Sequence, residues 1–240
     1  METRISKTKE EAGNSKGVLA WASQLVFATV TAGILLFLSA GRLDWVGGWA
    51  FFGLNLFTQL LSAWILIPRS SGLLAERSKV GKGTKNWDRF YAPAVIVVGT
   101  LAVMVTAGLD ARFGWSQPIH PAIWWAALSI AFASQLFVLW AMASNRFFAI
   151  TVRIQEERQH QVVDRGPYRF VRHPGYAGSV LYNLAIPVIL GSWWTFIPAV
   201  VTAGLLIART GLEDRTLQDE LPGYREYTQR TSFRLFPGIW

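Results

Sequence analysis

The chain has 240 residues, of which 52% are hydrophobic, and its formal net charge is +8. Cysteine is absent, which excludes disulfides, thiolate metal sites and a cysteine nucleophile. The sequence has no cluster of cations typical of a nucleic-acid-binding face, so no nucleic-acid partner is expected.

Five uncharged runs divide the chain, at residues 17–41, 45–68, 90–109, 113–145 and 173–208. A helix needs roughly 20 apolar residues to cross the hydrocarbon core, where no water satisfies exposed backbone groups. The first four runs reach this length. We therefore predict an integral membrane protein with several spans, because a soluble protein of this size is not expected to bury five such helices.

The first four runs are expected to form two helical hairpins, separated by a basic loop at residues 69–89. Residues 1–16 precede them as a polar tail. The first run is too long for a cleavable signal peptide and has no A-x-A-like end, so it is expected to remain as the first span.

The last run has 36 residues, which is more than one span requires at about 1.5 Å per residue. Pro187, Gly191 and the Trp193–Trp194 pair interrupt it near its middle. These residues predict a helical hairpin with arms at about 176–190 and 194–212. The first arm is short enough to be re-entrant or to lie among other helices. The chain therefore has five to six spans.

The distribution of the cations predicts the orientation in the membrane. With six spans, 21 of the 23 Lys and Arg residues lie on one side, and only Arg42 and Arg112 lie on the other. The positive-inside rule assigns the basic side to the cytoplasm. Both termini are therefore expected to lie in the cytoplasm. The membrane is expected to be the inner (cytoplasmic) membrane of a cell.

A polar segment with the sequence R-G-P-Y-R-F-V-R-H-P-G-Y, residues 165–176, precedes the last hairpin. Its proline-containing turns free backbone groups, its glycines allow a close approach, and its tyrosines offer flat faces to a nucleobase. The segment can therefore form a ligand site. A membrane re-entry loop, in which Arg169 and Arg172 contact lipid phosphates, is equally compatible with these residues.

Arg209 and Glu213 lie one helical turn apart where the last apolar run ends. Glu213 can accept a ligand ammonium group, and Arg209 can bind a carboxylate through its planar fork. Ionisable groups at such a boundary are often functional. The alternatives are an i,i+4 ion pair that stabilises the helix end and, for Glu213 and Asp214, a solvated face.

The three histidines do not predict a metal site, because His120 lies in an outer connection, away from His160 and His173. A histidine such as His160, in Q-H-Q-V-V, is more often a hydrogen-bonded structural residue than a catalyst. The sequence has no hydrolase triad, dinucleotide-binding glycine motif or metal-ligand spacing.

An ordered set of motifs resembles the isoprenylcysteine carboxyl methyltransferase family. The set is V-R-I-Q, H-Q-V-V and G-P-Y-R-F-V-R-H-P-G-Y-A-G, followed after the hairpin by R-x-x-x-E and P-G-Y-x-x-Y. The resemblance covers roughly residues 145–235 and not the N-terminal hairpins. Glu213–Asp214 replaces consecutive glutamates of the family, and residues 221–224 replace F-G-x-x-Y, but neither change touches the contacts that the family implies.

The resemblance implies a methyltransferase that uses S-adenosyl-L-methionine and no metal. Glu213 would hold the amino group of the cofactor, and Arg209 would face the carboxylate of a lipophilic or lipidated substrate. The implied cofactor-binding residues are Gln155, His160, Gln161, Val162, Val163, Tyr168, His173, Pro174, Gly175, Tyr176 and Glu213.

The predicted fold is an all-α polytopic membrane helix bundle. Residues 1–16 form a cytoplasmic tail, residues 17–144 form the N-terminal membrane helices, and residues 145–240 form a methyltransferase-like catalytic region. This region contains a cytoplasmic cofactor-binding segment, the hairpin at 176–212 and a C-terminal amphipathic helix that ends at Pro222–Gly223. The sequence does not indicate an oligomeric state.

Other functions are also compatible with the sequence. The R-H-P-x-Y part of the motif resembles phospholipid N-methyltransferases and membrane sterol reductases as well. NADPH-dependent reduction of a lipid or sterol, methylation of a phospholipid amine or small thiol, and a non-enzymatic membrane scaffold are the alternatives. The sequence does not identify the methyl acceptor.

Overall fold

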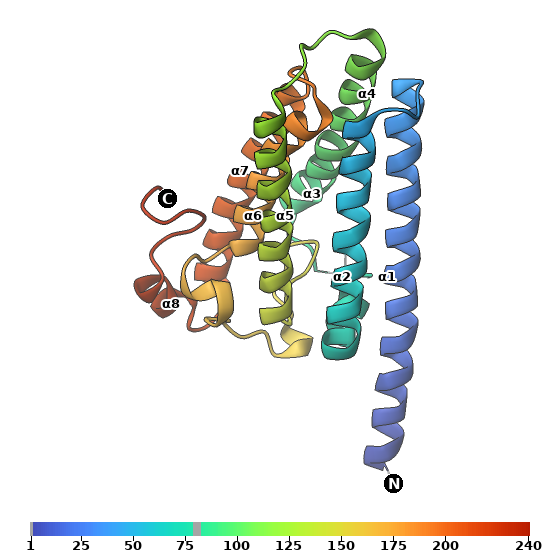
Figure 1. The fold of residues 1–240 in the computed structure, drawn as a ribbon. Helices are drawn as coiled ribbons and strands as arrows, with labels where there is room; N and C mark the ends of the chain where they lie inside the picture. Colours follow the sequence, from blue (N-terminus) through green and yellow to red (C-terminus); the bar gives the residue numbers. More distant parts are fainter. Residues whose placement is uncertain (1, 79–82) are drawn as a thin grey trace.

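The computed structural model describes the backbone of residues 2–78 and 83–240, and the side chains of residues 15–78 and 83–240. These residues form helices joined by connections, with no β-strand among them, which confirms the predicted all-α bundle (Figure 1). A π-helix over Val97–Ala102 joins α3 to α4. The α-helices are α1 (Glu2–Ala40), α2 (Val46–Arg77), α3 (Asp88–Ile96), α4 (Val103–Phe113), α5 (Pro121–Ser144), α6 (Pro174–Leu190), α7 (Phe196–Glu220) and α8 (Tyr224–Arg230).

Five helical segments of the described chain are long and apolar enough to cross a membrane. They are Ser15–Ala40, Val46–Arg77, Asp88–Phe113, Pro121–Ser144 and Phe196–Glu220. The shorter α6, with 17 residues, packs against α7 and forms the predicted hairpin with it. The chain is thus a multi-pass membrane protein.

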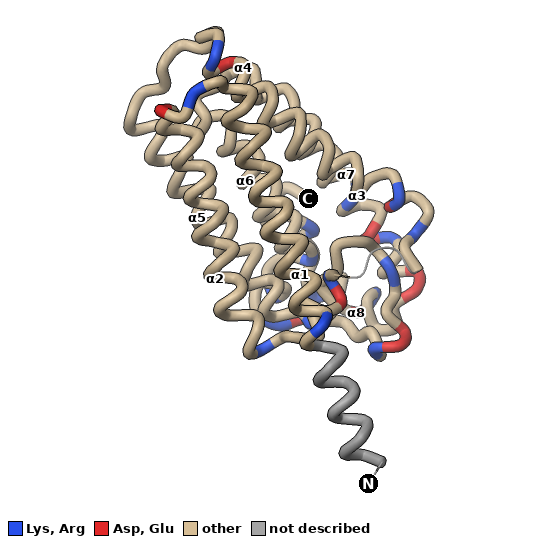
Figure 2. Tube along the Cα trace, turned by 90° about the vertical axis from the view of Figure 1, so that its right-hand side faces the viewer, with Lys and Arg blue, Asp and Glu red and all other residues tan. Residues whose placement is uncertain are grey.

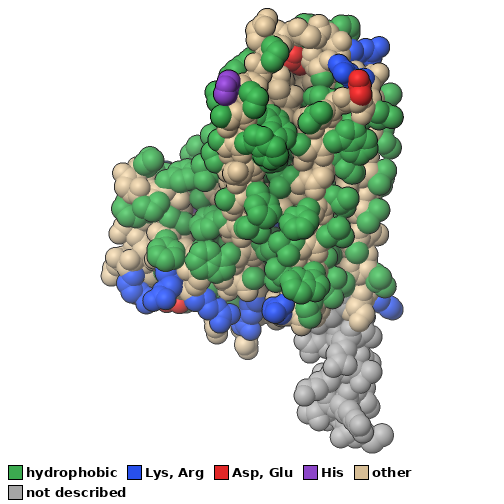
Figure 3. Space-filling view, in the orientation of Figure 1, with side chains coloured by type: hydrophobic (Ala, Val, Ile, Leu, Met, Phe, Trp, Pro, Cys, Tyr) green, Lys and Arg blue, Asp and Glu red, His purple; other side chains and the backbone are tan. Residues whose placement is uncertain are grey.

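A band of apolar side chains covers the middle of the bundle (Figure 3). Large hydrophobic residues of the membrane-spanning helices are strongly exposed, for example Phe27 (75%) of α1 and Trp64 (73%) of α2. A monomeric soluble protein rarely exposes an apolar surface of this extent, whereas the acyl chains of lipids cover it without loss of hydrogen bonds. The band therefore marks the surface that faces the bilayer.

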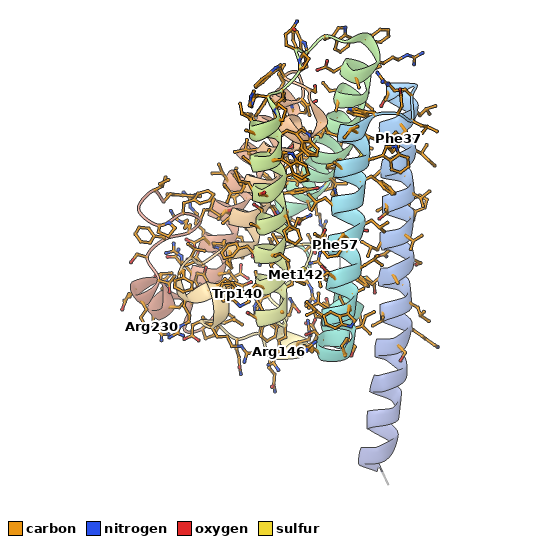
Figure 4. All side chains as sticks on the ribbon, viewed as in Figure 1. Phe37, Phe57, Trp140, Met142, Arg146 and Arg230 are labelled. Carbon is orange, nitrogen blue, oxygen red and sulfur yellow. The ribbon has the colours of Figure 1, made fainter. Side chains whose placement is uncertain are left out.

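Most of the charged residues gather at one end of the bundle (Figure 2). We call this the basic end; it comprises the C-terminal ends of α2, α5 and α7, the connection 145–173 and α8. Arg146 and Arg230 lie there, while Phe37 lies toward the opposite end (Figure 4). Arg42 and Arg112 are near that opposite end, so the separation of the cations along the sequence is also a separation in space for the cations that the structure describes.

Small residues bring the helices into close contact. Gly108 of α4 lies against Ser39 of α1, and Gly178 of α6 lies against α5, where an added Cβ would stand 2.9 Å from the carbonyl oxygen of Ser134. Small residues of this kind allow the close backbone approach that stabilises helix packing in lipid. The second contact fixes α6, and with it the polar segment that precedes α6, against α5.

Two helix boundaries differ from the prediction. α2 continues past Pro68 to Arg77, where the sequence predicts a loop, and its geometry is broken at Ser70 (φ −149°, ψ 40°). A proline can kink a helix without ending it. α7 continues to Glu220, so the expected C-terminal amphipathic helix is the end of α7, and α8 follows after a turn. Residues 79–82 of the predicted basic loop lie outside the described residues.

Candidate functional site

A cavity of about 300 Å³ lies at the basic end of the bundle. It is bounded by the connection 145–173, the N-terminal end of α6, the C-terminal half of α7 and α8, and the last residue of α2 borders it. Small-molecule sites in proteins measure roughly 300–1,000 Å³. The cavity is therefore of a size that admits a small ligand.

The residues that the sequence motifs single out come from three separate segments, and they meet in this cavity. It is lined by Gln155, His160, Gln161, Val162, Val163, Tyr168, His173, Gly175, Tyr176, Arg209 and Glu213. Of the twelve candidate residues, Pro174 is the exception, since it does not line the cavity but begins α6.

Two turns shape the segment that precedes α6. Gly166 adopts a positive φ of 60°, which would be strained for a residue with a side chain, and it begins a 3-10 helix over Gly166–Arg169 with Pro167 in its first turn. At Gly175, an added Cβ would lie 2.6 Å from the ring of Phe148. The absence of a side chain at Gly175 therefore lets the aromatic ring of Phe148 pack directly on the first turn of α6.

Asp214 is a fully buried carboxylate next to the cavity. It accepts hydrogen bonds from Arg172 (Nε–Oδ1 2.8 Å and Nη2–Oδ2 2.9 Å), Arg234 (Nε–Oδ2 2.8 Å) and Tyr224 (3.1 Å), and its Oδ1 lies 3.2 Å from His173 Nε2. Burial and the charge of Asp214 raise the pKa of the Tyr224 phenol, which therefore stays a donor. The solvated-face alternative is wrong for Asp214, because this residue fixes three cavity-lining side chains.

Arg209 is held by an acid from the N-terminal half of the chain. Asp88, at the start of α3, is fully buried and accepts hydrogen bonds from Arg209 Nε (2.6 Å) and Nη2 (2.9 Å). Nη2 also donates to the carbonyl of Ile150 (2.6 Å), and the N–H of Val152 donates to Asp88 (2.7 Å). One side of the planar fork is thus occupied, and Nη1 is the nitrogen of Arg209 without a hydrogen bond to a described residue.

Glu213 does not pair with Arg209 among the described residues, so the i,i+4 ion pair considered from the sequence is absent there. Instead, Glu213 accepts a hydrogen bond of 2.6 Å from the hydroxyl of Tyr176. The carboxylate therefore lines the cavity with a neutral partner and keeps acceptor capacity for a positively charged ligand group.

Gln155 and His160 belong to the part of the cavity wall that the connection 145–173 forms. The side-chain amide of Gln155 donates to the carbonyl of Phe147 (2.7 Å), and its oxygen accepts from Arg158 (2.7 Å). The His160 ring packs against the Phe147 ring at a tilt of 37° (centroids 4.5 Å apart). Burial, together with the nearby charges of Arg153 and Arg158, lowers the pKa of His160 to about 4. His160 is therefore neutral at physiological pH.

Asp88 and Arg77 are charged residues of the site that sequence reasoning missed. Asp88 had a signal that could have found it, since an acid two residues before an apolar run is a candidate for a buried partner. Arg77 had none, because it falls in the predicted basic loop with five other cations. Among the described residues there is no group of three His, Asp or Glu side chains that could hold a metal ion.

The fold and the cavity define a polytopic membrane protein with a cavity of apolar, aromatic and charged residues at the basic end of its bundle. Residues 126–219 match the sequence model of the isoprenylcysteine carboxyl methyltransferase (ICMT) family. The chain belongs to this family of membrane methyltransferases.

Curated relatives match different lengths of the chain. Uncharacterized protein YpbQ of Bacillus subtilis is 31% identical over 166 residues, which are 67% of this chain and 96% of the relative. Protein-S-isoprenylcysteine O-methyltransferase B of Arabidopsis thaliana is 30% identical over 91 residues, or 37% of this chain and 46% of the relative. A probable protein-S-isoprenylcysteine O-methyltransferase of Oryza sativa subsp. indica is 37% identical over 49 residues, or 20% and 26%. The chain thus matches less than half of the length of each plant protein.

Proposed function

We propose that this protein transfers a methyl group from S-adenosyl-L-methionine to a lipophilic acceptor at the cytoplasmic face of the membrane. The observation that carries the proposal is the convergence of eleven motif residues, from three segments, on one cavity at the basic end of a membrane bundle. Residues that merely anchored a re-entry loop at the interface would have no reason to share a cavity.

The residues present suit this cofactor. The carboxylate of Glu213 is available for an ammonium group, because its partner is the neutral hydroxyl of Tyr176. Val162, Val163 and the ring of Tyr176 give the wall apolar and aromatic surface of the kind that a nucleobase requires. When bound, S-adenosyl-L-methionine supplies an electrophilic methyl group on a sulfonium centre.

The residues of the chain have to align the reactants and exclude water. An anionic acceptor such as a carboxylate needs no general base, which agrees with a site that offers rigid ion pairs and a neutral His160. Asp88 fixes Arg209 by two hydrogen bonds, and Arg209 Nη1 would hold the acceptor carboxylate. This is a single contact, in place of the two-point fork expected from the sequence.

An acceptor with a lipophilic tail and a carboxylate, of the isoprenylcysteine type, fits this site best. The cavity lies at the end of the apolar band, so a substrate could keep its tail among the helices or in lipid. The positive-inside rule places the basic end, and both termini, in the cytoplasm, where a soluble cofactor is available.

A binding experiment separates this function from its alternatives. The purified full-length protein in lipid nanodiscs is titrated with S-adenosyl-L-methionine, S-adenosylhomocysteine and NADPH in a calorimeter. Saturable binding of the first two and not of NADPH is expected. Binding of NADPH alone would favour the reductase, and binding of none would favour the scaffold. Incubation with methyl-labelled cofactor and a lipid extract then identifies the acceptor as an acid, an amine or a thiol.

A further inference from the structure

The residues that line the cavity include more cations than anions. Four arginines and one glutamate line it, with no aspartate or lysine among the lining residues. Three of these arginines have carboxylate partners: Arg153 pairs with Glu76 and Glu157, Arg172 with Asp214, and Arg209 with Asp88. The fourth is Arg77, the last residue of α2.

Arg77 has no carboxylate partner among the described residues. Its Nε is buried without any hydrogen-bond partner, and its Nη1 makes one long hydrogen bond of 3.4 Å to the carbonyl of Phe148. Its guanidinium lies over the Phe148 ring, 5.4 Å from the centroid. That ring packs on Gly175, so Arg77, Phe148 and the first turn of α6 form consecutive layers of the cavity wall.

A guanidinium in this position is only partly stabilised by the protein. The C-terminal end of α2 and the face of an aromatic ring both attract a cation, but neither supplies a negative charge. Buried charges in proteins are normally paired, and a buried nitrogen without a partner loses hydrogen bonds that water would provide. An anion in the cavity would supply the missing partner for Arg77.

We propose that Arg77 binds the carboxylate of a ligand in this cavity. The assignment rests on the proposed function, which supplies two carboxylates. The amino-acid part of S-adenosyl-L-methionine carries an ammonium and a carboxylate, which match the two charged lining residues that form no ion pair with a described residue, Glu213 and Arg77. The lipophilic acceptor is the second source. In both cases Nη2 of Arg77, which makes no hydrogen bond to a described residue, would donate to the carboxylate.

The test compares Arg77→Met, Arg77→Lys and the control Arg69→Met, which removes an exposed arginine of the same helix that does not line the cavity. Each full-length variant in nanodiscs is titrated with S-adenosylhomocysteine and with its decarboxylated analogue, which keeps the amino group. An N-acylated S-prenylcysteine and its carboxamide serve as probes of the acceptor. The acid is tested as a methyl acceptor, and both compounds are tested as competing ligands.

A cofactor contact predicts that Arg77→Met weakens S-adenosylhomocysteine binding at least tenfold, or about 1.4 kcal/mol, and leaves the decarboxylated analogue unaffected. An acceptor contact predicts unchanged cofactor affinity, with a KM for the prenylcysteine acid raised at least tenfold and unchanged binding of the carboxamide. Arg77→Lys should fall between the wild type and Arg77→Met, and Arg69→Met should behave as the wild type.

Two results would overturn the assignment: unchanged affinity of Arg77→Met for S-adenosylhomocysteine and for the S-prenylcysteine acid, or an equal loss of affinity in Arg69→Met. In either case, S-adenosylhomocysteine binding by the wild type would still support the proposed function. If the wild type binds neither probe, the proposed function itself fails. If Arg77→Met does not fold, the wild type decides: equal affinity for each acid and its carboxylate-free analogue would also overturn the assignment.

Discussion

Asp88 and Arg209 are 121 residues apart in the sequence, yet their side chains form a two-point ion pair with Nε–Oδ1 and Nη2–Oδ2 distances of 2.6 and 2.9 Å. Asp88 is fully buried, and Arg209 is 8% exposed. The pair joins the start of α3 to the C-terminal half of α7 and, through Val152 and Ile150, to the connection 145–173. It is therefore the junction between the N-terminal helices and the cavity.

Replacement of Asp88 by Asn should leave the charge of Arg209 buried without compensation. Breaking a buried pair in this way typically costs about 3–5 kcal/mol, and Asn retains part of the hydrogen bonding, so a loss near the lower end of this range is expected. Thermal unfolding in detergent and methyl transfer in nanodiscs measure the two effects. Asp44→Asn, in the exposed pair with Arg42, is the matched control and should change neither; a similar loss in both variants would contradict the assigned role.

Replacement of Glu213 by Gln should weaken cofactor binding, because it removes the charge that we assign to the ammonium group and keeps the shape. Hydrogen bonds to charged groups contribute about 1.5–3 kcal/mol, so affinity should fall at least tenfold. Tyr176→Phe, which removes the hydroxyl that orients Glu213, should have a smaller effect. Calorimetry with S-adenosylhomocysteine provides the measurement, and Glu226→Gln on the surface of α8 is the control. Unchanged affinity in Glu213→Gln would reject the assignment.

Protonation of His160 should destabilise the protein in mild acid. Its pKa is lowered from 6.5 to about 4 in the folded state, mainly by burial and further by Arg153 and Arg158. A histidine with a lowered folded-state pKa contributes its full stability above the unfolded pKa of 6.5, and this contribution is lost as the pH falls from 6.5 toward 4. The loss amounts to about 2 kcal/mol at a pH of about 5 and continues to grow toward a pH of about 4.

The unfolding midpoint of the wild type should therefore fall more steeply across this pH range than that of His160→Gln, which does not titrate. Ligand binding by the wild type should be independent of His160 protonation near neutral pH, since the imidazole is already neutral there. Parallel pH profiles for the two proteins would show that His160 is not protected in the folded state.

Replacement of Gly175 by Ala should disturb the cavity wall. The new methyl group would lie 2.6 Å from the Phe148 ring, so the ring and the guanidinium of Arg77 above it have to move. Overpacking of this kind typically costs about 1–3 kcal/mol, and the shifted wall should weaken cofactor binding as well. Gly204→Ala in α7, where an added Cβ meets nothing within 4 Å, is the control and should be neutral or slightly stabilising. Equal stability of the two variants would contradict the close contact.

The spans were predictable because the hydrocarbon core excludes charge, and this requirement produces long uncharged runs that can be identified in the sequence. The interruption at Pro187 and Gly191 also identified the short α6 correctly. The predicted end of α2 was too early. In a sequence, a proline such as Pro68 indicates a helix end, but in a bundle the neighbouring helices can stabilise a helix that is kinked at a proline.

The candidate site was predictable to the extent that its residues are close in sequence or belong to a motif. The partners of those residues were not. Asp88 pairs with Arg209 across 121 residues. Asp214 forms ion pairs with Arg172, which precedes α7 in the sequence, and with Arg234, which follows it. A sequence reports the charge of such groups but not their burial, so Asp214 was indistinguishable from a surface acid. For the same reason, the sequence did not show that Arg77 lines the cavity.

The ion pair between Asp88 and Arg209 has a practical consequence for dissecting this protein. The family match begins at residue 126, which invites the expression of the C-terminal region as a minimal enzyme or its exchange between relatives in chimeras. Such a fragment would lack Asp88 and would leave Arg209 without its counter-charge. A graft should therefore carry the start of α3 along with the C-terminal region, and a split protein should regain binding only when both pieces are produced together.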